Sequence, residues 1–281
     1  MFDKVLIANR GEIAVRINRA CQELGISTVA IHSEADRESM HVRIADESVC
    51  IGPNPVNKSY LNAHSIISAC EITGAQAVHP GYGFLSENAS FAKMLEDHKL
   101  TFIGPKYKHI EMMGNKIQAK KIMTDLGVPT VPGSDKAIDN EKDAIEISKE
   151  IGFPVLLKAS SGGGGRGMRV VHNEKELIMA LPIIKQEALS FFSNDSIYVE
   201  KYIDSPRHIE VQIICDNHGN YIHLHERDCS VQRRNQKVIE EALAPEIDQE
   251  KKNNLFEICV KAMKNMGYLG LGTLEFLYDD G

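Results

Sequence analysis

The first third of the chain alternates between short apolar runs and helical patterns. Residues 4–8 are mostly apolar, and apolar side chains then recur at helical spacing until Gly25. A second apolar run at 27–32 follows, so this stretch predicts a βαβ unit with parallel strands. Helical patterns at 61–73 and 88–98 and apolar runs at 48–51, 75–79 and 101–103 continue the alternation. Together these elements predict an open α/β domain.

From residue 114 onward the pattern is mixed. Helical patterns reach Leu126 and cover residues 140–151, and a strand at 153–159 is separated from one at 168–172 by a glycine-rich loop. Two strands joined by such a loop predict a β-hairpin. Alternating apolar residues indicate further strands at 197–202, 209–215, 221–226 and 272–278. The second region is therefore expected to be α+β, with a largely antiparallel sheet.

Composition and charge narrow the class of protein. The 281 residues are 43% hydrophobic and 25% charged, which is typical of a globular protein. A net charge of -7 argues against a nucleic-acid partner, since phosphate-backbone binding needs a basic surface. No apolar run reaches membrane-spanning length, the N-terminus lacks the apolar stretch of a signal peptide, and the six cysteines show no paired spacing. We expect a cytoplasmic protein with reduced thiols and no membrane segment.

The turns of the first domain favour a structural role. Residues 9–12 contain a single glycine, whereas a dinucleotide pyrophosphate approaches a helix start that carries three. Nicotinamide or flavin binding is therefore the less favoured alternative. The loop at 79–88 has the composition of a shaped turn, and His79 by itself indicates no catalysis.

Lys158 and the four consecutive glycines at 162–165 are the clearest candidates for phosphate binding. Glycine amides can turn toward phosphate oxygens without a Cβ in the way, and the ammonium adds charge for the same anion. The Gly-Lys-Ser/Thr ending of a P-loop is missing, and the loop leads into a strand. A hairpin that closes over a triphosphate fits this pattern, and a merely flexible surface hairpin is the alternative.

Three other segments place polar residues in unusual settings. Residues 226–241 interleave acids and bases, which suits a site for a small anion and Mg²⁺ and equally suits a salt-bridged surface strand. Glu275 stands between apolar residues on a predicted core strand, and a buried carboxylate there would need a partner, either a metal ion or a lysine. Residues 200–203 end a strand where backbone groups could contact an adenine edge, although a solvated strand end has the same pattern.

The whole chain resembles the biotin carboxylase family in five segments that occur in the family's order: 7–14, 79–88, 158–168, 200–203 and 226–234. The resemblance implies a Rossmann-like (pre-ATP-grasp) domain over residues 1–113. An incomplete α+β ATP-grasp domain is implied for 114–281, with a lid subdomain at about 131–203. The family also implies a homodimer that works with a biotin carboxyl carrier protein and carboxyltransferase subunits.

The reaction implied by the resemblance is ATP-dependent carboxylation of biotin. ATP phosphorylates bicarbonate to carboxyphosphate, which supplies CO₂ to carrier-bound biotin in the first half-reaction of an acetyl-CoA carboxylase of fatty acid synthesis. Pyruvate and propionyl-CoA carboxylases carry a similar component. The resemblance also implies Mg²⁺ or Mn²⁺ as the metal ion.

The resemblance carries ligand roles onto individual residues. Lys237 would contact bicarbonate, and Glu275 would bind the metal ion. Among the ATP-binding positions, two lysines would contact phosphates, two glycines would lie in the lid, and most others would hold adenine and ribose. These positions are Lys116, Lys158, Gly164, Gly165, Glu200, Lys201, Tyr202, Ile203, His208, Asn235 and Glu275.

Three departures from the family pattern modify these expectations. Asn235 replaces a usual nucleotide-contacting histidine, and Leu243 replaces a usual proline. The strand at 272–278 runs into an Asp-Gly turn, which predicts a hairpin whose returning strand, with a second metal-binding glutamate, is absent. We therefore expect the chain alone to be inactive and poorly soluble or associated with another fragment. A catalytically inactive nucleotide-binding or assembly module and another ATP-grasp ligase are the alternative functions.

Overall fold

The computed structural model describes residues 1–138, 140–160, 167–192 and 194–279. The chain divides into two compact units, Met1–Glu111 with one sheet and Met112–Gly281 with several, and each unit has its own apolar clusters. Among the helices in these ranges, none is both long enough and apolar enough to cross a membrane.

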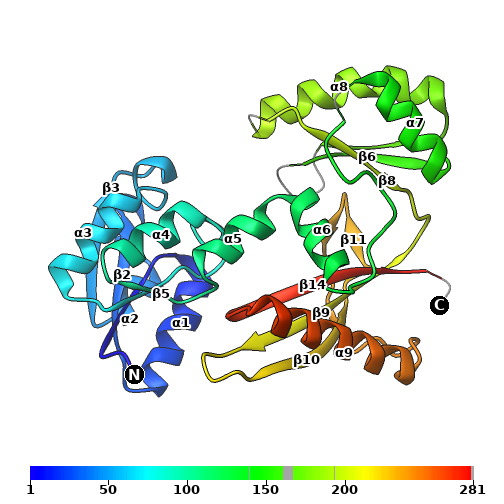
Figure 1. Ribbon diagram of the computed structural model, residues 1–281. Helices are drawn as coiled ribbons and strands as arrows, with labels where there is room; N and C mark the ends of the chain where they lie inside the picture. The colour runs from blue at the N-terminus through cyan, green and yellow to red at the C-terminus, as the bar shows by residue number, and fades with distance from the viewer. Residues whose placement is uncertain (139, 161–166, 193, 280–281) are drawn as a thin grey trace. The chain divides into compact units, whose positions relative to one another are not determined.

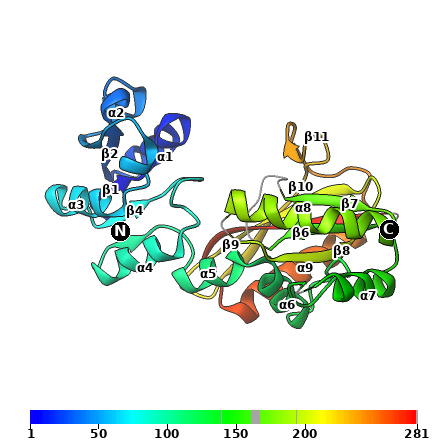
Figure 2. The same ribbon diagram turned by 90° about the horizontal axis from the view of Figure 1, so that it is seen from above.

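The first unit is a five-stranded parallel sheet with helices on both faces (Figures 1 and 2). The strand order is β3-β2-β1-β4-β5, and the predicted βαβ unit is confirmed because β1 and β2 run parallel. Its elements are β1 (Lys4–Ile7), α1 (Gly11–Glu23), β2 (Ser27–Ser33), α2 (Met40–Ile44), β3 (Glu47–Gly52), α3 (Ala63–Thr73), β4 (Ala77–His79), α4 (Ala89–Asp97) and β5 (Thr101–Phe102), with 3₁₀ turns at Glu34–Asp36 and Val56–Lys58.

The side chains on the two faces of β1 belong to two different apolar cores. Successive side chains of a strand point to opposite faces, so Leu6 joins the core that includes Phe91 of α4. Val5 and Ile7 join the other core, together with Ile17 of α1. A strand that is buried on both faces has a continuous apolar sequence, which is why this domain could be predicted.

The second unit starts within α5 (Tyr107–Gly114) and contains a three-stranded antiparallel sheet in the order β7-β6-β8. Helices α7 and α8 contribute to the apolar core on this sheet. The hairpin predicted for β6 and β7 is confirmed, while its glycine-rich tip lies outside the described residues. The elements are α6 (Lys116–Asp125), α7 (Glu141–Ile151), β6 (Val155–Ala159), β7 (Met168–Val171), α8 (Glu174–Phe192) and β8 (Ile197–Lys201).

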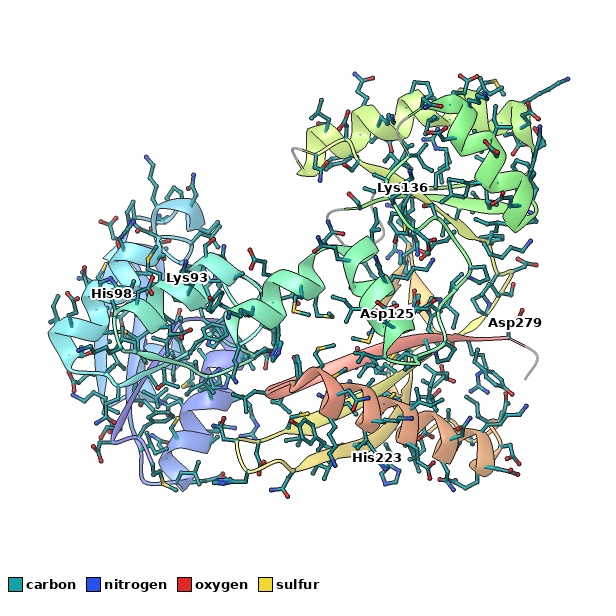
Figure 3. All side chains as sticks on the ribbon, viewed as in Figure 1. Lys93, His98, Asp125, Lys136, His223 and Asp279 are labelled. Atoms are coloured by element: carbon teal, nitrogen blue, oxygen red, sulfur yellow. The ribbon has the colours of Figure 1, made fainter. Side chains whose placement is uncertain are left out.

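A four-stranded antiparallel sheet in the order β13-β10-β9-β14 completes the second unit. Helix α9 packs on one face, where Val211 and Ile213 join the core with Phe256. His223 of β10, labelled in Figure 3, stacks on Phe256 with ring centroids 4.2 Å apart. The elements are β9 (Arg207–Cys215), β10 (Tyr221–Asp228), the hairpin of β11 (Gln232–Arg233) and β12 (Gln236–Lys237), β13 (Glu241–Ala242), α9 (Gln249–Met266) and β14 (Gly270–Tyr278).

Two long helices, α8 and α9, were not predicted from the sequence. Helix α8 contains Pro182 and exposes apolar residues such as Met179 and Ile183, which weakens its apolar periodicity. Helix α9 buries a stripe that includes Phe256 and Met263 within a strongly charged segment. The region also forms separate antiparallel sheets where one was expected, because alternation identifies strands without identifying their partners.

Replacing Ile213 with alanine should lower the free energy of unfolding of the second unit by about 2–5 kcal/mol, because its fully buried side chain lies in the core under α9. The matched control is Ile214→Ala, which removes a partly buried side chain from the opposite face of the same strand and should cost much less. Urea denaturation measures both. Equal losses would show that the two faces are wrongly assigned.

Candidate functional site

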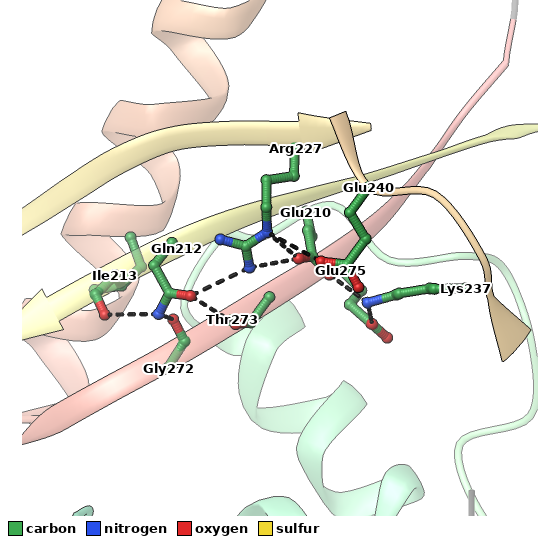
Figure 4. A network of polar contacts seen from close by, with 9 residues as sticks. All are labelled: Glu210, Gln212, Ile213, Arg227, Lys237, Glu240, Gly272, Thr273 and Glu275. Carbon is green, nitrogen blue, oxygen red and sulfur yellow. Dashed lines mark hydrogen bonds and ion pairs between the residues drawn. The ribbon is translucent and has the colours of Figure 1, made fainter. Parts of the chain in front are cut away.

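A row of three charged residues crosses the polar face of the β13-β10-β9-β14 sheet. Arg227 of β10 is in register with Glu210 of β9, which is in register with Glu275 of β14. Carboxylates directly opposite each other on neighbouring strands repel, so this row needs cations to be stable. Figure 4 shows the polar contacts that supply them.

Lys237 of β12 bridges the two glutamates. Its Nζ lies 2.6 Å from Glu275 Oε1 and also forms an ion pair with Glu210. Burial opposes the charged form of Lys237, but hydrogen bonds to both carboxylates outweigh it and raise its pKa above the ordinary value. This ammonium therefore stays protonated at neutral pH and fixes the distance between the two strands' carboxylates.

Glu210 is the buried centre of the row, with its side chain 4% exposed. Burial opposes its ionisation, yet hydrogen bonds from Lys237 and Arg227 outweigh that effect and lower its pKa. Arg227 also donates to Gln212 Oε1 at 3.2 Å, and Gln212 donates to the Gly272 carbonyl at 2.9 Å. Glu210 is thus held as an anion within a hydrogen-bonded network.

A second charged cluster lies where β6, β8 and α6 meet. Lys158 Nζ lies 2.6 Å from Glu200 Oε2, and Lys120 Nζ lies 3.4 Å from Glu200 Oε1. Lys116 is the first residue of α6, after the cap Asn115. Burial lowers the pKa of Lys116, and the positive charge of Lys158 lowers it further against the opposing charges of Glu200 and Glu275.

The two clusters act on one another electrostatically. The charge of Glu275 is felt at Lys116 on α6 and also at His208 on β9. Burial lowers the pKa of His208, with Glu275 opposing the shift, so the imidazole is neutral at pH 7. The structure therefore gathers several predicted ligand residues into one region of the second unit: Lys116, Lys158, Glu200, His208, Lys237 and Glu275.

The strand end after Glu200 is tied to the preceding loops. Lys201 Nζ donates to the Gly152 carbonyl at 2.9 Å, and the Lys201 amide donates to the Pro132 carbonyl at 2.8 Å. The Tyr202 amide donates to the Pro154 carbonyl at 3.2 Å. Tyr202 and Ile203 are half-buried, so this segment is an ordered edge rather than a solvated strand end.

Other predicted positions lie apart from the charged clusters or outside the description. Asn235 is exposed in the β11–β12 turn with a left-handed φ of 61°. Leu243 has a left-handed φ of 71°, a value that proline, the residue usual here in the family, cannot adopt. Gly164 and Gly165 fall outside the described residues.

Sequence reasoning missed Glu210, Gln212 and Lys120 as members of the site. Glu210 and Gln212 alternate with apolar residues along β9, and that alternation was a signal of one polar and one core face. Lys120 stands one helical turn after Lys116, a spacing that places both lysines on the same side of α6.

Two places among the described residues offer ligand atoms for a metal ion, and Glu275 suits a hard cation such as Mg²⁺ better than the second place does. The expectation that Glu275 is buried was wrong, because its side chain lies on the polar face of the sheet and is 68% exposed. Carboxylate oxygens are preferred Mg²⁺ ligands. Among the described residues, Glu210, Cys229 and Glu240 also bring potential ligand atoms within 4.8 Å of one another. This second group suits Mg²⁺ less well, because Cys229 offers a sulfur ligand and both oxygens of Glu210 are held by Arg227 and Lys237.

Comparison with known protein families accounts for both units. Residues 1–110 match the family model described as biotin carboxylase, N-terminal domain. Residues 115–281 match the model described as carbamoyl-phosphate synthase L chain, ATP binding domain. The chain belongs to the biotin carboxylase family.

Individual relatives give the extent of the likeness. A biotin carboxylase of Allochromatium vinosum is 57% identical over the whole chain, and a propionyl-CoA carboxylase alpha chain of Ruegeria pomeroyi is 50% identical over 99% of it. The chain spans 63% of the first relative's length and 41% of the second's. This family member therefore corresponds to part of each relative.

Solved structures of the family have the same fold as this chain. A biotin carboxylase–β,γ-ATP complex from Campylobacter jejuni superimposes with a TM-score of 0.97 at 49% identity, covering 100% of this chain and 63% of that one. The biotin carboxylase domain dimer of Hydrogenobacter thermophilus 2-oxoglutarate carboxylase, solved with MgADP, ADP and bicarbonate, gives 0.96 at 51% identity, covering 100% and 62%. The predicted ATP-grasp fold and family resemblance are confirmed.

Glu210→Gln should destabilise the second unit by roughly 2 kcal/mol at pH 7, the order of one hydrogen bond to a charged group. The folded-state pKa of Glu210 lies below the ordinary carboxyl value, so its ionised form contributes stability above about pH 4.3 that is lost as pH falls through the folded pKa. The difference in the free energy of unfolding between the wild type and Glu210→Gln should therefore shrink in acid. Denaturant titrations from pH 7 to pH 3 measure it.

Glu257→Gln, on the exposed side of α9, is the matched control for this titration. It should show little change at any pH. A pH-independent loss in Glu210→Gln would show that side-chain packing, and not the charge, is what Glu210 contributes.

Proposed function

We propose that the protein binds MgATP and bicarbonate and takes part in carboxylation of biotin. The observation that carries the proposal is Lys237, a charged ammonium held between Glu210 and Glu275 in the same unit as a lysine-rich cluster. An anion-binding cation next to a metal-type carboxylate is the arrangement that phosphoryl transfer to bicarbonate needs. The ligands named for two relatives support the same ligands here: β,γ-ATP for the C. jejuni structure, and MgADP, ADP and bicarbonate for the H. thermophilus structure.

Lys116 and Lys158 are proposed to neutralise the nucleotide phosphates. Both lysines are half-buried, and partial removal from water strengthens the attraction of their ammonium groups for phosphate oxygens. Lys158 pairs with Glu200 in this structure, and we propose that it exchanges this carboxylate for a phosphate when nucleotide binds. Gly164 and Gly165 are proposed to belong to the lid over the phosphates.

Lys237 is proposed to hold bicarbonate, and Glu275 to hold Mg²⁺. Bound Mg²⁺ would shield the negative charge of the phosphates. Lys237 remains anchored by Glu210 if Glu275 turns to a cation, because the ammonium has two carboxylate partners. Glu210 thus keeps Lys237 charged and in place for its anion.

The adenosine part of the nucleotide is proposed to lie along Glu200, Lys201, Tyr202 and Ile203, with neutral His208 beside the ribose. The backbone of this segment is ordered by its bonds to Pro132 and Pro154, which favours recognition by its remaining polar groups. Asn235 is proposed to approach the nucleotide from the β11–β12 turn. We also propose a domain boundary at residues 113/114 and a lid subdomain at about 131–203.

The proposed partners follow from the relatives. A dimer is named for the H. thermophilus domain, which supports a homodimer here. Biotin carried on a carrier protein and transfer of its carboxyl group by separate subunits to acetyl-CoA are proposed for the complete system. Relatives named for propionyl-CoA and 2-oxoglutarate show that the family serves several acceptors.

Lys237→Met should lower bicarbonate-dependent ATP hydrolysis about 100-fold, the order of losing one transition-state donor, while MgATP affinity changes little. The assay measures phosphate release with free biotin and Mg²⁺, for the chain alone and with the remaining segment of a full-length relative added. Calorimetry measures MgATP affinity in parallel.

Lys158→Met is the matched variant and should show the reverse pattern, with weakened MgATP binding. Loss of MgATP binding in both variants would contradict the separate roles of the two lysines. Nucleotide binding without hydrolysis, even in the presence of the added segment, would favour the inactive binding module.

A further inference from the structure

Lys120 shares the Glu200 carboxylate with Lys158. The Lys158 ammonium lies 2.6 Å from Oε2 and the Lys120 ammonium 3.4 Å from Oε1. The three side chains are 23%, 17% and 13% exposed for Lys158, Lys120 and Glu200, so the group is largely removed from water. One carboxylate therefore faces two ammonium groups, and only one of these was expected to bind a ligand.

Gly133 provides the space in which the Lys120 ammonium lies. Residue 133 forms a β-bridge with Glu200, and a Cβ on it would be 2.5 Å from the Val199 carbonyl oxygen and 2.6 Å from Lys120 Nζ. The glycine is required by this close approach and not by a left-handed φ. The loop after α6 thus confines Lys120 against Glu200.

A second cation matters when Lys158 leaves Glu200 for a phosphate. Removing the only partner of a largely buried carboxylate is strongly unfavourable, since the carboxylate has lost most of its hydration. If Lys158 were the sole partner, this cost would oppose nucleotide binding. With Lys120 in place, Glu200 keeps a counter-charge after the exchange.

We propose that Lys120 is a positioning residue that keeps Glu200 neutralised and in place while Lys158 engages the nucleotide phosphates. Lys120 acts through Glu200 and does not itself contact phosphate. This role rests on the proposed function, because it presupposes that Lys158 binds the phosphates of ATP. The proposed role distinguishes Lys120 from Lys116. The surroundings of Lys116 include the charges of Lys158 and Glu275 as well as that of Glu200.

The test compares the affinities of ATP and adenosine for the whole chain by calorimetry. Lys120→Met should weaken ATP binding about tenfold, equivalent to about 1.4 kcal/mol. Adenosine affinity should change little, because adenosine has no phosphates and leaves the Lys158–Glu200 pair intact. Lys120→Gln provides a second variant, thermal unfolding checks that both fold, and Lys121→Met, exposed on the same helix, is the matched control.

A double-mutant cycle with Glu200→Gln identifies the route of the effect. If Lys120 acts through Glu200, adding Lys120→Met to Glu200→Gln should cause no further loss of ATP affinity. A loss that persists in the Glu200→Gln background would overturn the proposal in favour of direct phosphate contact. Equal losses for ATP and adenosine would overturn it in favour of a general structural role, and an unchanged ATP affinity would also overturn it.

Failure of the proposed function gives a different result. Wild-type protein that binds no ATP would refute nucleotide binding, and the role of Lys120 with it. Wild-type protein that binds ATP as tightly as Lys120→Met would refute the role of Lys120 alone.

Discussion

Glu210 and Glu275 face each other across the β9–β14 ladder, and the candidate site depends on the cations that hold these carboxylates together. Lys237 lies between them, and Arg227 neutralises Glu210 from the other neighbouring strand. The pleat sends their apolar neighbours to the opposite face, where α9 covers them. The same strands therefore build a core and a charged site, and neither can shift by one residue without disrupting the other.

Both charged clusters share one principle, a lysine paired with a carboxylate that has a second cationic partner. Glu200 is shared by Lys158 and Lys120, and Glu210 by Lys237 and Arg227. In each cluster the second cation keeps the buried carboxylate paired whatever else the lysine contacts.

Much of the fold and part of the site could be predicted, because local sequence patterns mark them. Continuous apolar runs identified the buried parallel strands of the first unit, and the glycine-rich loop marked the β6–β7 hairpin. For Glu275 two alternatives were open, and the structure shows the ion pair with a lysine, Lys237, while metal binding stays a proposal. Helices α8 and α9 escaped prediction because an internal proline and a charged background obscured their periodicity.

The sequence by itself determined the strand and helix patterns, the family, and the residue types available for phosphate, metal and bicarbonate. Only the tertiary structure decided which of them meet. Lys120 and Glu200 are 80 residues apart along the chain, and Lys237 and Glu275 are 38 apart. The periodicity of the sequence indicates only the local backbone conformation. Contacts between distant residues form when separate strands pair in the register that buries their apolar faces.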